Sequence, residues 1–448
     1  MLEEILSAAN MRNAYERVVS NKGAAGVDGM CVDELHDHLC ANWAGIKSRL
    51  QQGTYVPSAV RKVEIPKPNG GKRMLGIPTV TDRLIQQAIA QKLTEMYDDG
   101  FSESSFGFRP NRSARQAAQR ALYYLNNGSR QVVELDLEKF FDRVNHDKLM
   151  SILCERITDK VLLKLIRKYL QSGIMEGGLM STRTEGTPQG SPLSPILSNI
   201  LLDKLDKELE RRSLRFVRYA DDCSIYVSSQ RSAERVLQSI TSYLEGKLLL
   251  KVNREKSKVS RPDKSQLLGF SFWRCGKGKW ALCVAPRAKE RLKDKIRLIT
   301  KRNRGVSIRQ ITDELRMATC GWVNYFNIAN CHKFLDGLDD RIRRRLRAYI
   351  WKQWQFIRTR KKKLRKFNVP EWAIHKLAYT RKGPTRISSM LNTVLTDKYL
   401  YNVGFTPALE YYVKTSSLMN RRVPNGTHGG VRLCHEKHVL NASQLCRR

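Results

Sequence analysis

Residues 214–227 of this 448-residue chain read LRFVRYADDCSIYV and contain the acidic pair Asp221 and Asp222. Apolar residues flank the pair on both sides, which predicts two strands joined by a tight turn at the carboxylates. By itself, an acidic pair at a turn is more typical of two solvated surface carboxylates than of a metal site. A third carboxylate on a neighbouring strand would favour a metal site instead.

Asp136 is the candidate for that third carboxylate, because it follows the run QVVEL at 131–135, which predicts a strand. Clustered carboxylates repel one another, and bound divalent cations relieve that repulsion. Hard oxygen ligands favour Mg²⁺, and two such ions stabilise the attacking and leaving oxygens of phosphoryl transfer. The three aspartates therefore predict a two-metal site.

The surrounding elements are predicted to be a mixture of hairpins and helices. Two β-rich runs in 60–78 flank a Pro-Asn-Gly-Gly turn, which predicts a hairpin, and Thr81 is the expected N-cap of the helix that follows. Further segments are predicted as helices over 3–52 (interrupted by the glycine-rich residues 22–29), 81–97, 146–171, 193–211 and 231–249, and as short strands over 251–284. This order favours an α+β body rather than regular βαβ repeats.

The charge of the chain predicts a polyanionic partner. Lys and Arg number 81 and Asp and Glu 43, so the formal net charge is +38. Such a surplus repels itself unless a polyanion shares the surface, and nucleic acid is the expected partner. No apolar run is long enough to span a membrane, and the ten cysteines have no CxxC spacing, which is typical of reduced cytosolic thiols.

The positive charge is concentrated after Pro286, where the chain is predicted to be mostly helical. Residues 285–366 hold 25 Lys or Arg against 7 Asp or Glu. In 341–354 a stripe of apolar residues at helical spacing indicates a core face, while Arg covers the rest. The cations expected to bind RNA are Arg343, Arg344, Arg345, Lys361 and Lys362. A nuclear-import patch would have a similar composition.

A series of short blocks resembles the reverse transcriptases encoded by group II introns, in that family's order, over roughly residues 20–415. The blocks are KGAAGVDGM at 22–30, VEIPKPNGGKRMLGIPTVTDRLIQQAI at 63–89, FGFRPNRSARQA at 106–117, ELDLEKFFDRVNH at 134–146, GTPQGSPLSPILSNILLDKLD at 186–206, RYADD at 218–222, LKVNREKSKV at 250–259 and LLGF at 267–270. Each short block is weak alone, whereas the ordered set is very specific.

The resemblance implies a right-hand polymerase, with fingers and palm, followed by an all-α thumb or maturase domain. It makes Asp136, Asp221 and Asp222 the catalytic triad, with the Leu137 carbonyl as a further metal ligand. The implied cofactor is a pair of Mg²⁺ ions, for which Mn²⁺ is a substitute. The nearby acids Glu138, Asp142 and Asp147 are interpreted as surface or structural residues.

The nucleotide triphosphate needs cationic partners, and the resemblance assigns Lys67 and Arg73 of the predicted hairpin to it. Arg61 and Lys62 are second choices, and ordinary exposed charges on a hairpin are the alternative. Phe141 is the implied steric gate that excludes a ribose 2′-hydroxyl.

Two further roles come from the same resemblance. Gln189 is expected near the sugar and base of the nucleotide. Apart from the resemblance, Phe140 is interpreted as a core residue, and a core position is also the alternative for Phe141. The template and primer contacts are expected at Ser191, Tyr219, Leu268 and Gly269. Without the resemblance, residues 267–270 would be interpreted as a buried strand.

Five segments are predicted. They are an N-terminal extension with fingers (1–125), a palm (126–285), a thumb or maturase X domain (286–355), a DNA-binding-like extension (356–415) and a tail (416–448). The family's HNH endonuclease is not expected here, because the chain ends too soon to hold one. Cys434, His435, His438 and Cys446 fit no zinc spacing.

The predicted function is that of a group II intron reverse transcriptase and maturase in a bacterial cytosolic ribonucleoprotein. Its expected partners are the intron RNA, an RNA template with a DNA primer, a DNA target and dNTPs. The oligomeric state is left open, a dimer included. One alternative is a domesticated relative in DNA repair or phage defence. Another, of a different class, is a splicing cofactor without polymerase activity.

Overall fold

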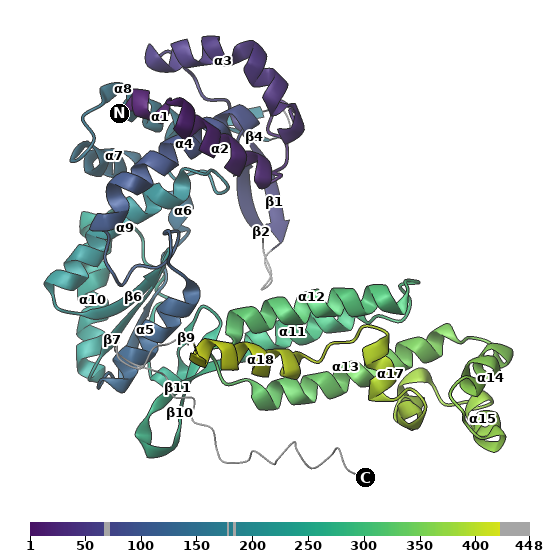
Figure 1. Ribbon diagram of the computed structural model, residues 1–448. Helices are drawn as coiled ribbons and strands as arrows, with labels where there is room; N and C mark the ends of the chain where they lie inside the picture. The colour runs from purple at the N-terminus through teal and green to yellow at the C-terminus, as the bar shows by residue number, and fades with distance from the viewer. Residues whose placement is uncertain (67–71, 177–178, 182–184, 422–448) are drawn as a thin grey trace. The chain divides into compact units, whose positions relative to one another are not determined.

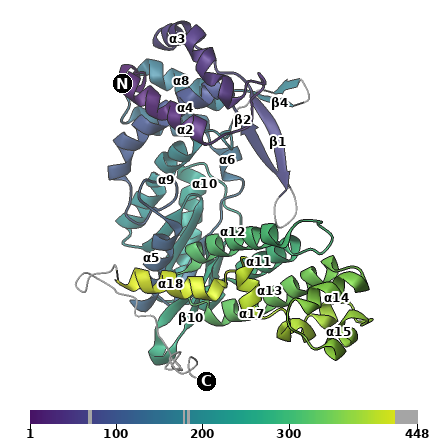
Figure 2. The ribbon, with the colours of Figure 1, turned by 45° about the vertical axis from the view of Figure 1, so that its right-hand side comes forward.

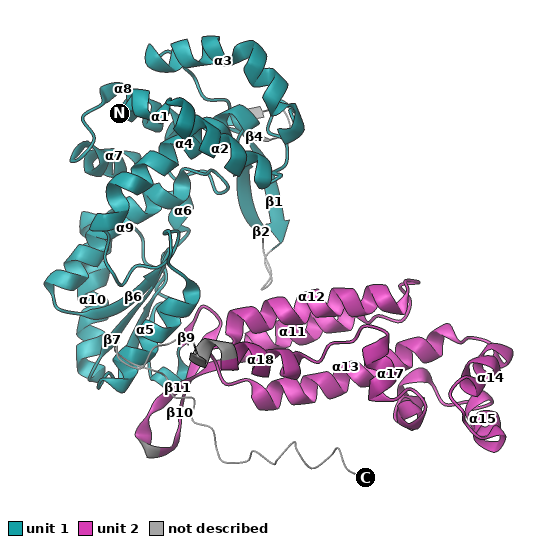
Figure 3. Ribbon diagram, in the orientation of Figure 1, with its two compact units in different colours: residues 1–265 teal, residues 266–448 magenta. Residues whose placement is uncertain are grey.

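The structure is a computed structural model that describes residues 1–66, 72–176, 179–181 and 185–421 (Figure 1). Two compact units divide the chain between residues 265 and 266 (Figure 3). The first unit is a mixture of helices and small sheets. The second consists of a three-stranded sheet and a series of helices.

The helices of the first unit begin and end as follows: α1 Leu2–Ile5, α2 Ala8–Ser20, α3 Leu35–Gln51, α4 Val80–Tyr97, α5 Ala114–Asn126, α6 Phe140–Arg143, α7 His146–Cys154, α8 Lys160–Gln171, α9 Ser194–Arg211 and α10 Gln230–Lys247. Most of the predicted helices are confirmed. Thr81 was the wrong cap for α4, because the Thr79 hydroxyl accepts the Asp82 amide hydrogen at 3.2 Å and Thr81 lies inside the helix.

The strands of the first unit form two sheets. They are β1 Val60–Pro66, β2 Lys72–Ile77, β3 Gln131–Leu135, β4 Ile174–Glu176, β5 Leu179–Ser181, β6 Arg215–Tyr219, β7 Asp222–Val227 and β8 Lys258–Ser260. One sheet has the order β6-β7-β3-β8, and its strands are antiparallel. The other has the order β2-β1-β4-β5 and contains the predicted hairpin, β1 and β2.

One continuous core joins the helices to the β6-β7-β3-β8 sheet. Helices α5 and α10 pack on that sheet, and α9 contributes a row of buried leucines and isoleucines that includes Leu197 and Leu201. Inward-facing Val133, Leu135 and Ile225 complete the sheet's side of this core. Such a core holds the strand ends that carry the predicted aspartates at fixed positions.

The second unit begins with β9 Gln266–Leu267, β10 Phe270–Arg274 and β11 Trp280–Val284. Its helices are α11 Pro286–Ile299, α12 Ile308–Phe326, α13 His332–Gln353, α14 Ile357–Arg365, α15 Glu371–Ala378, α16 Pro384–Ile387, α17 Asp397–Asn402 and α18 Ala408–Arg421. Figure 2 shows α11, α12 and α13 side by side, as in Figure 1, and α18 contacts both α12 and α13.

The α+β fold class and the helical C-terminal region are confirmed. Residues 267–270 are not one buried strand, because Leu268 and Gly269 have positive φ angles of 52° and 83° and turn the chain between β9 and β10. The units divide at 265, whereas the predicted palm extends to 285, and the five-segment division stays a prediction. No helix within the described residues is long and apolar enough to cross a membrane.

Candidate active site

The strand register brings the three predicted aspartates together. β6 and β7 form a hairpin in which Tyr219 pairs with Asp222, so Ala220 and Asp221 make the turn. Leu135 of β3 pairs with Cys223 of β7. One step further along this antiparallel pair, Asp136 comes opposite Asp222. The hairpin that the sequence predicts therefore places the acidic pair beside the third carboxylate.

The electrostatics of the aspartates agree with this placement. Desolvation, followed by the negative charges of Asp221 and Asp136, raises the pKa of the Asp222 carboxyl to about 6. Desolvation and the charge of Asp136 also raise the pKa of Asp221, which the positive charge of Arg73 lowers in part. The carboxylates thus lie close enough to repel one another, as a site for cations requires.

A lysine accompanies the aspartates. The Lys256 ammonium lies 3.4 Å from an Asp136 carboxylate oxygen, and its charge also acts on Asp222. Among the described residues, no group of three or more His, Cys, Asp or Glu side chains is arranged so that it could hold a metal ion as it stands. The donors are nevertheless all hard carboxylate oxygens, which suit a divalent cation. Leu137, the further expected ligand, is buried and forms a bridge with Val252.

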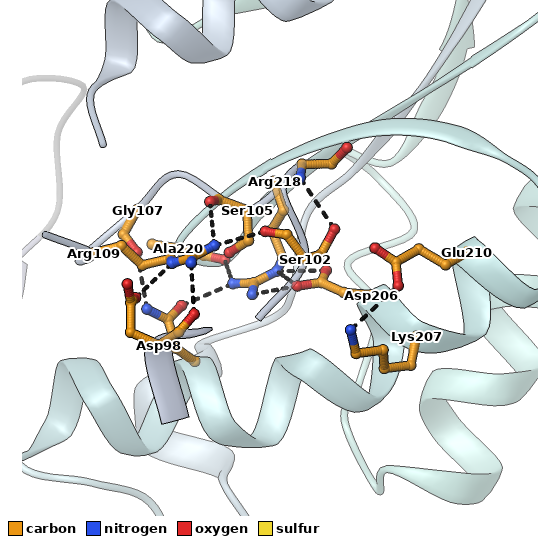
Figure 4. A network of polar contacts seen from close by, with 12 residues as sticks. Asp98, Ser102, Ser105, Gly107, Arg109, Asp206, Lys207, Glu210, Arg218 and Ala220 are labelled. Atoms are coloured by element: carbon orange, nitrogen blue, oxygen red, sulfur yellow. Dashed lines mark hydrogen bonds and ion pairs between the residues drawn. The ribbon is translucent and has the colours of Figure 1, made fainter. Parts of the chain in front are cut away.

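A buried arginine holds the turn that carries the acidic pair (Figure 4). Arg218 has no exposed side-chain surface and forms an ion pair with Asp206 of α9 at 2.6 Å. Its guanidinium also donates to the Ala220 carbonyl at 3.0 Å and to the Asn199 side chain. Ala220 has a positive φ of 56°, which L-residues rarely adopt. The hydrogen bond to its carbonyl therefore supports a strained turn.

A loop over residues 102–109 contacts the same turn from the other side. Arg109 anchors it by donating to Asp98 and to the carbonyls of Ser102 and Ser105, as Figure 4 shows. The backbone of Arg218 pairs with Ser104 and Phe106 through two hydrogen bonds of 2.9 Å.

Gly107 is the point of closest approach in this loop. A Cβ atom added there would lie 2.2 Å from the Ala220 amide nitrogen. The Gly107 carbonyl accepts a hydrogen bond from the Asn199 side chain, which in turn accepts one from Arg218. The turn that carries the acidic pair is thus held by contacts with both Arg218 and Gly107.

Of the predicted nucleotide residues, Arg73, Phe141 and Gln189 lie within the described part of the chain. Lys67 lies outside the described residues. Arg73 of β2 is exposed, and its charge acts on Asp221. Phe141 is partly buried, and its ring lies 5.2 Å from that of Phe140, which belongs to the core.

Gln189 links helix α6 to the β1–β2 hairpin. Its side-chain amide donates to Asp142 at 3.3 Å, and its carbonyl accepts the Gly76 amide hydrogen at 2.9 Å. The preceding Thr187 donates its amide hydrogen to the Phe141 carbonyl at 2.6 Å. Gln189, Phe141 and strand β2 are therefore tied into one local structure.

The predicted template and primer residues differ in accessibility. Tyr219 ends β6 beside the acidic pair and is partly exposed. Ser191 is buried and donates to Gln86 at 2.6 Å, which favours a structural role for its side chain. Leu268 and Gly269 form the β9–β10 turn in the second unit, where the Leu268 carbonyl accepts from Tyr325. The nearby acids Glu138 and Asp147 form ion pairs, as expected of structural residues.

The predicted RNA-binding arginines of α13 do not all face solvent. Arg343 forms ion pairs with Asp340 and Asp397, whereas Arg344 is exposed. Arg345 is partly buried and donates to the Thr300 hydroxyl. On α14, Lys361 lies 4.7 Å above the Tyr379 ring and Lys362 is exposed.

Sequence reasoning missed the residues that hold the site, above all Arg218, Asp206 and Gly107. A signal for the first was present, because an arginine at a core-facing position of an apolar strand needs a buried partner. The identity of that partner depends on tertiary contacts between α9 and β6. Lys256 lies within the quoted block at 250–259, but no pattern in that block indicates its approach to Asp136.

Comparisons with known proteins identify the family to which this chain belongs. A family described as "Reverse transcriptase (RNA-dependent DNA polymerase)" matches residues 65–272, and "Group II intron, maturase-specific domain" matches residues 289–367. Protein YkfC of Escherichia coli is 32% identical over 289 residues, which cover 56% of this chain and 76% of that protein. The chain belongs to the group II intron reverse transcriptase family.

Other relatives in this family are intron-encoded by name. The group II intron-encoded protein LtrA of Lactococcus lactis is 38% identical over 206 residues, which cover 46% of this chain and 34% of LtrA. The putative COX1/OXI3 intron 2 protein of Saccharomyces cerevisiae is 29% identical, over 58% of this chain and 36% of that protein. The matched segments thus span about a third of these two relatives.

One solved structure in the comparison is a partial Cas6-RT-Cas1–Cas2 complex. The match covers 55% of this chain and 42% of the matched chain of that complex, with 24% sequence identity and a TM-score of 0.36. This likeness is too low to add to the family assignment.

Proposed function

We propose that this chain copies RNA into DNA by adding dNTPs to the 3′-hydroxyl of a DNA primer. The observation that carries the proposal is the β3–β7 register, which sets Asp136 opposite Asp222 with Asp221 in the adjoining turn. Membership of the reverse transcriptase family supports the same reaction. Family members are in general dependent on divalent metal ions.

The residues proposed to hold two Mg²⁺ ions, or Mn²⁺ in their place, are Asp136, Asp221 and Asp222. When bound, such ions stabilise the attacking and leaving oxygens of phosphoryl transfer. Lys256 pairs with Asp136 and keeps part of the carboxylate charge neutralised in the free protein. Arg218 and Gly107 keep the turn in one conformation, so the two adjacent carboxylates are presented from a fixed backbone.

Arg73, Phe141 and Gln189 are proposed to receive the nucleotide, with Lys67 as the second cation for its triphosphate. Arg73 supplies a positive charge that acts on Asp221. The hydrogen bond from the Thr187 amide to the Phe141 carbonyl holds the Phe141 backbone, and the Phe141 ring would contact the sugar. Such a ring excludes a 2′-hydroxyl by steric clash.

We also propose that the second unit binds the intron RNA and assists its splicing, and that a DNA target is a further partner. The maturase-specific match at residues 289–367 supports this role. The basic surplus of residues 285–366 gives the sequence-independent affinity for phosphates that RNA binding requires.

Primer extension with Asp222→Asn tests the polymerase. Wild-type protein is expected to extend a DNA primer on an RNA template with Mg²⁺ and dNTPs. The variant should lose activity by roughly a hundredfold or more, since even changes outside the ligand set cost 10–100-fold at metal sites. Asp99→Asn, which removes an exposed acid, is the matched control and should leave extension unchanged. Equal extension by Asp222→Asn and wild type would contradict the site.

A splicing assay with the native intron on the same preparations tests the maturase role separately. Polymerase activity without any effect on splicing would favour the domesticated alternative. Splicing assistance without extension by the wild type would favour the non-catalytic cofactor.

A further inference from the structure

The second unit contains a basic cavity where three segments meet. Its volume is about 630 Å³, and it is lined by the residues after α11, by one face of α13 and by α16. The cations that line it are Lys301, Arg302, Arg341, Arg344, Arg345 and Arg386. Hydroxyl groups, among them those of Thr385 and Ser389, complete the wall, and no Asp or Glu is among its described lining residues.

The arginines of helix α13 fall into two groups, one that forms ion pairs with Asp397 and one that lines the cavity. Arg343 and Arg347 form ion pairs with Asp397, and Arg347 is buried and also donates to the Leu395 carbonyl at 2.7 Å. These two arginines therefore stabilise the packing of α13 against α17. Arg341, Arg344 and Arg345 instead line the cavity.

The cavity's cations are not neutralised within the protein. Among the described residues, none of the six forms an ion pair within 4.0 Å with an acidic side chain, whereas both arginines that face Asp397 do. Arg345 is fixed by donating to Thr300 and to the Arg297 carbonyl at 3.1 Å. Burial, and then the positive charges of Arg302, Arg297 and Arg341, lower the pKa of Arg345. A bound anion would relieve this repulsion.

A second cavity of about 760 Å³ continues the first. It shares Arg302, Thr385 and Arg386 with the first and adds Arg381 and Lys382. Neither cavity has an aromatic ring among the described residues that line it. A third hollow on α14 differs, because Tyr379 and Ile357 line it together with cations. Aromatic rings serve base stacking, whereas cations and hydroxyls without them suit phosphates.

We propose that the two joined cavities are a binding site for consecutive phosphodiester groups of one RNA strand. The inference rests on the proposed RNA-binding function and deepens it, since it selects which cations contact the backbone. Arg302 and Arg386, which line both cavities, hold the phosphate at the junction. Arg343, predicted to bind RNA from the sequence alone, is excluded by its ion pairs with Asp340 and Asp397.

The salt dependence of RNA binding tests this site. The full-length protein and the R302Q/R386Q variant are titrated with labelled intron RNA at several NaCl concentrations. Each phosphate contact contributes about 0.7 to 0.9 to the slope of log K against log salt, so the variant's slope should fall by about 1.4 to 1.8. R302K/R386K retains both charges and should keep the wild-type slope.

The matched control is R309Q/K333Q, which removes two exposed cations of the same unit that line neither cavity. It should bind RNA with the wild-type slope, and equal slopes for the control and R302Q/R386Q would overturn the proposal. Inorganic tripolyphosphate is the probe for a small-molecule site. Tight tripolyphosphate binding that R302Q/R386Q abolishes, with an unchanged RNA slope, would assign the cavities to a free polyphosphate and overturn the RNA assignment.

Primer extension on a short oligonucleotide template separates this proposal from the polymerase proposal. R302Q/R386Q should extend such a primer as wild type does, and it should melt no lower than wild type, because the loss of two like charges weakens the repulsion in the cavities. A wild-type protein that binds RNA with the expected slope but extends no primer would contradict the polymerase and support the phosphate site.

Discussion

Gly107 shows how one residue type maintains the geometry of the candidate active site. It lies in the loop anchored by Arg109 and touches the backbone of Tyr219 and Ala220. Its φ is not in the left-handed region, so backbone conformation alone would allow alanine. Glycine is required at this position because the turn that carries Asp221 and Asp222 occupies the space that a Cβ atom would need.

Gly107→Ala is therefore expected to impair catalysis more than folding. The new Cβ would lie 2.2 Å from the Ala220 amide nitrogen, so the turn or the loop must shift. A displacement near 1 Å can cost about 100-fold in rate. We expect kcat for primer extension to fall by about that factor, with a smaller change in the KM for template–primer.

Gly45→Ala is the matched control, because a Cβ at Gly45 meets nothing within 4 Å in the middle of α3. It should leave kcat unchanged and raise helix stability by about 1 kcal/mol. If Gly107→Ala keeps wild-type kcat, the loop yields and the contact has no role in positioning the aspartates.

Phe141→Val is expected to weaken discrimination against ribonucleotides. The loss of ring volume opens space beside the sugar, and a pocket change of this size alters discrimination by roughly 10- to 200-fold. The measurement is the ratio of kcat/KM for a dNTP and its rNTP. Phe140→Val is the control, because Phe140 is 3% exposed and should lower thermal stability without changing that ratio. An unchanged ratio in Phe141→Val would show that its ring is only core.

At the residue scale, the sequence was sufficient to name three candidate carboxylates but not the residues that hold them. Asp136, Asp221 and Asp222 are found by the ordered blocks around them, and the strand register now sets them side by side. Arg218 and Gly107 act through contacts with segments more than ten residues away in sequence, which no local pattern encodes.

Helix α9 illustrates the element scale, because it carries two acids on its inner side. Asp206 is fully buried and paired with Arg218. Asp203 is partly buried, and one of its carboxylate oxygens is buried without a hydrogen-bond partner among the described residues. Burial, and then the charge of Asp206, raise the pKa of Asp203 from 3.8 to about 6.

Asp203→Asn is expected to stabilise the protein at neutral pH. The folded-state pKa of Asp203 lies above its unfolded value, so the native state binds more protons between about pH 4 and pH 6. Above pH 6 the ionised Asp203 carboxylate therefore lowers the free energy of unfolding, by at most about 3 kcal/mol. This loss disappears as the pH falls through 6 and the carboxyl group takes up a proton. Asn carries no charge, so the variant should melt higher than wild type at pH 7.5, with no advantage near pH 4.

Asp206→Asn is the contrasting control on the same helix. It leaves the buried Arg218 without its ion pair, which typically costs about 3–5 kcal/mol, so it should destabilise the protein across this pH range. An Asp203→Asn melting temperature that follows wild type at every pH would show that Asp203 is solvated in the folded protein.

Helices and strands were predictable where local pattern and tertiary packing agree. The hairpins β1–β2 and β6–β7 and helices such as α9 and α10 have strong periodicity and clear ends. The short strands β4 and β5 were missed, because β4 depends on its parallel pairing with the distant β1. Without the family resemblance, the Leu268-Gly269 turn would be interpreted as strand, because its apolar letters do not show the positive φ angles.

At the scale of the whole molecule, charge is the property that most constrains behaviour. The chain carries a net +38, and the basic cavities of the second unit gather like charges without acidic partners among their lining residues. Self-repulsion of this kind destabilises a folded protein in the absence of a counter-charge. The composition predicted a polyanionic partner, but which cations converge depended on the packing of α11, α13 and α16.

We therefore expect both NaCl and RNA to stabilise the protein, and we expect NaCl to weaken the stabilisation by RNA. In the free protein, the melting temperature should rise as NaCl increases from about 50 to 300 mM, because screening weakens the repulsion. At low salt, intron RNA at 100 times its Kd should add about 2.7 kcal/mol of stability, and this gain should shrink as salt weakens binding. Differential scanning fluorimetry with and without RNA measures both trends. Neutral dextran is the control for crowding and should reproduce neither. A free-protein melting temperature that is independent of NaCl would show that the positive charges are too far apart in the folded chain to repel one another.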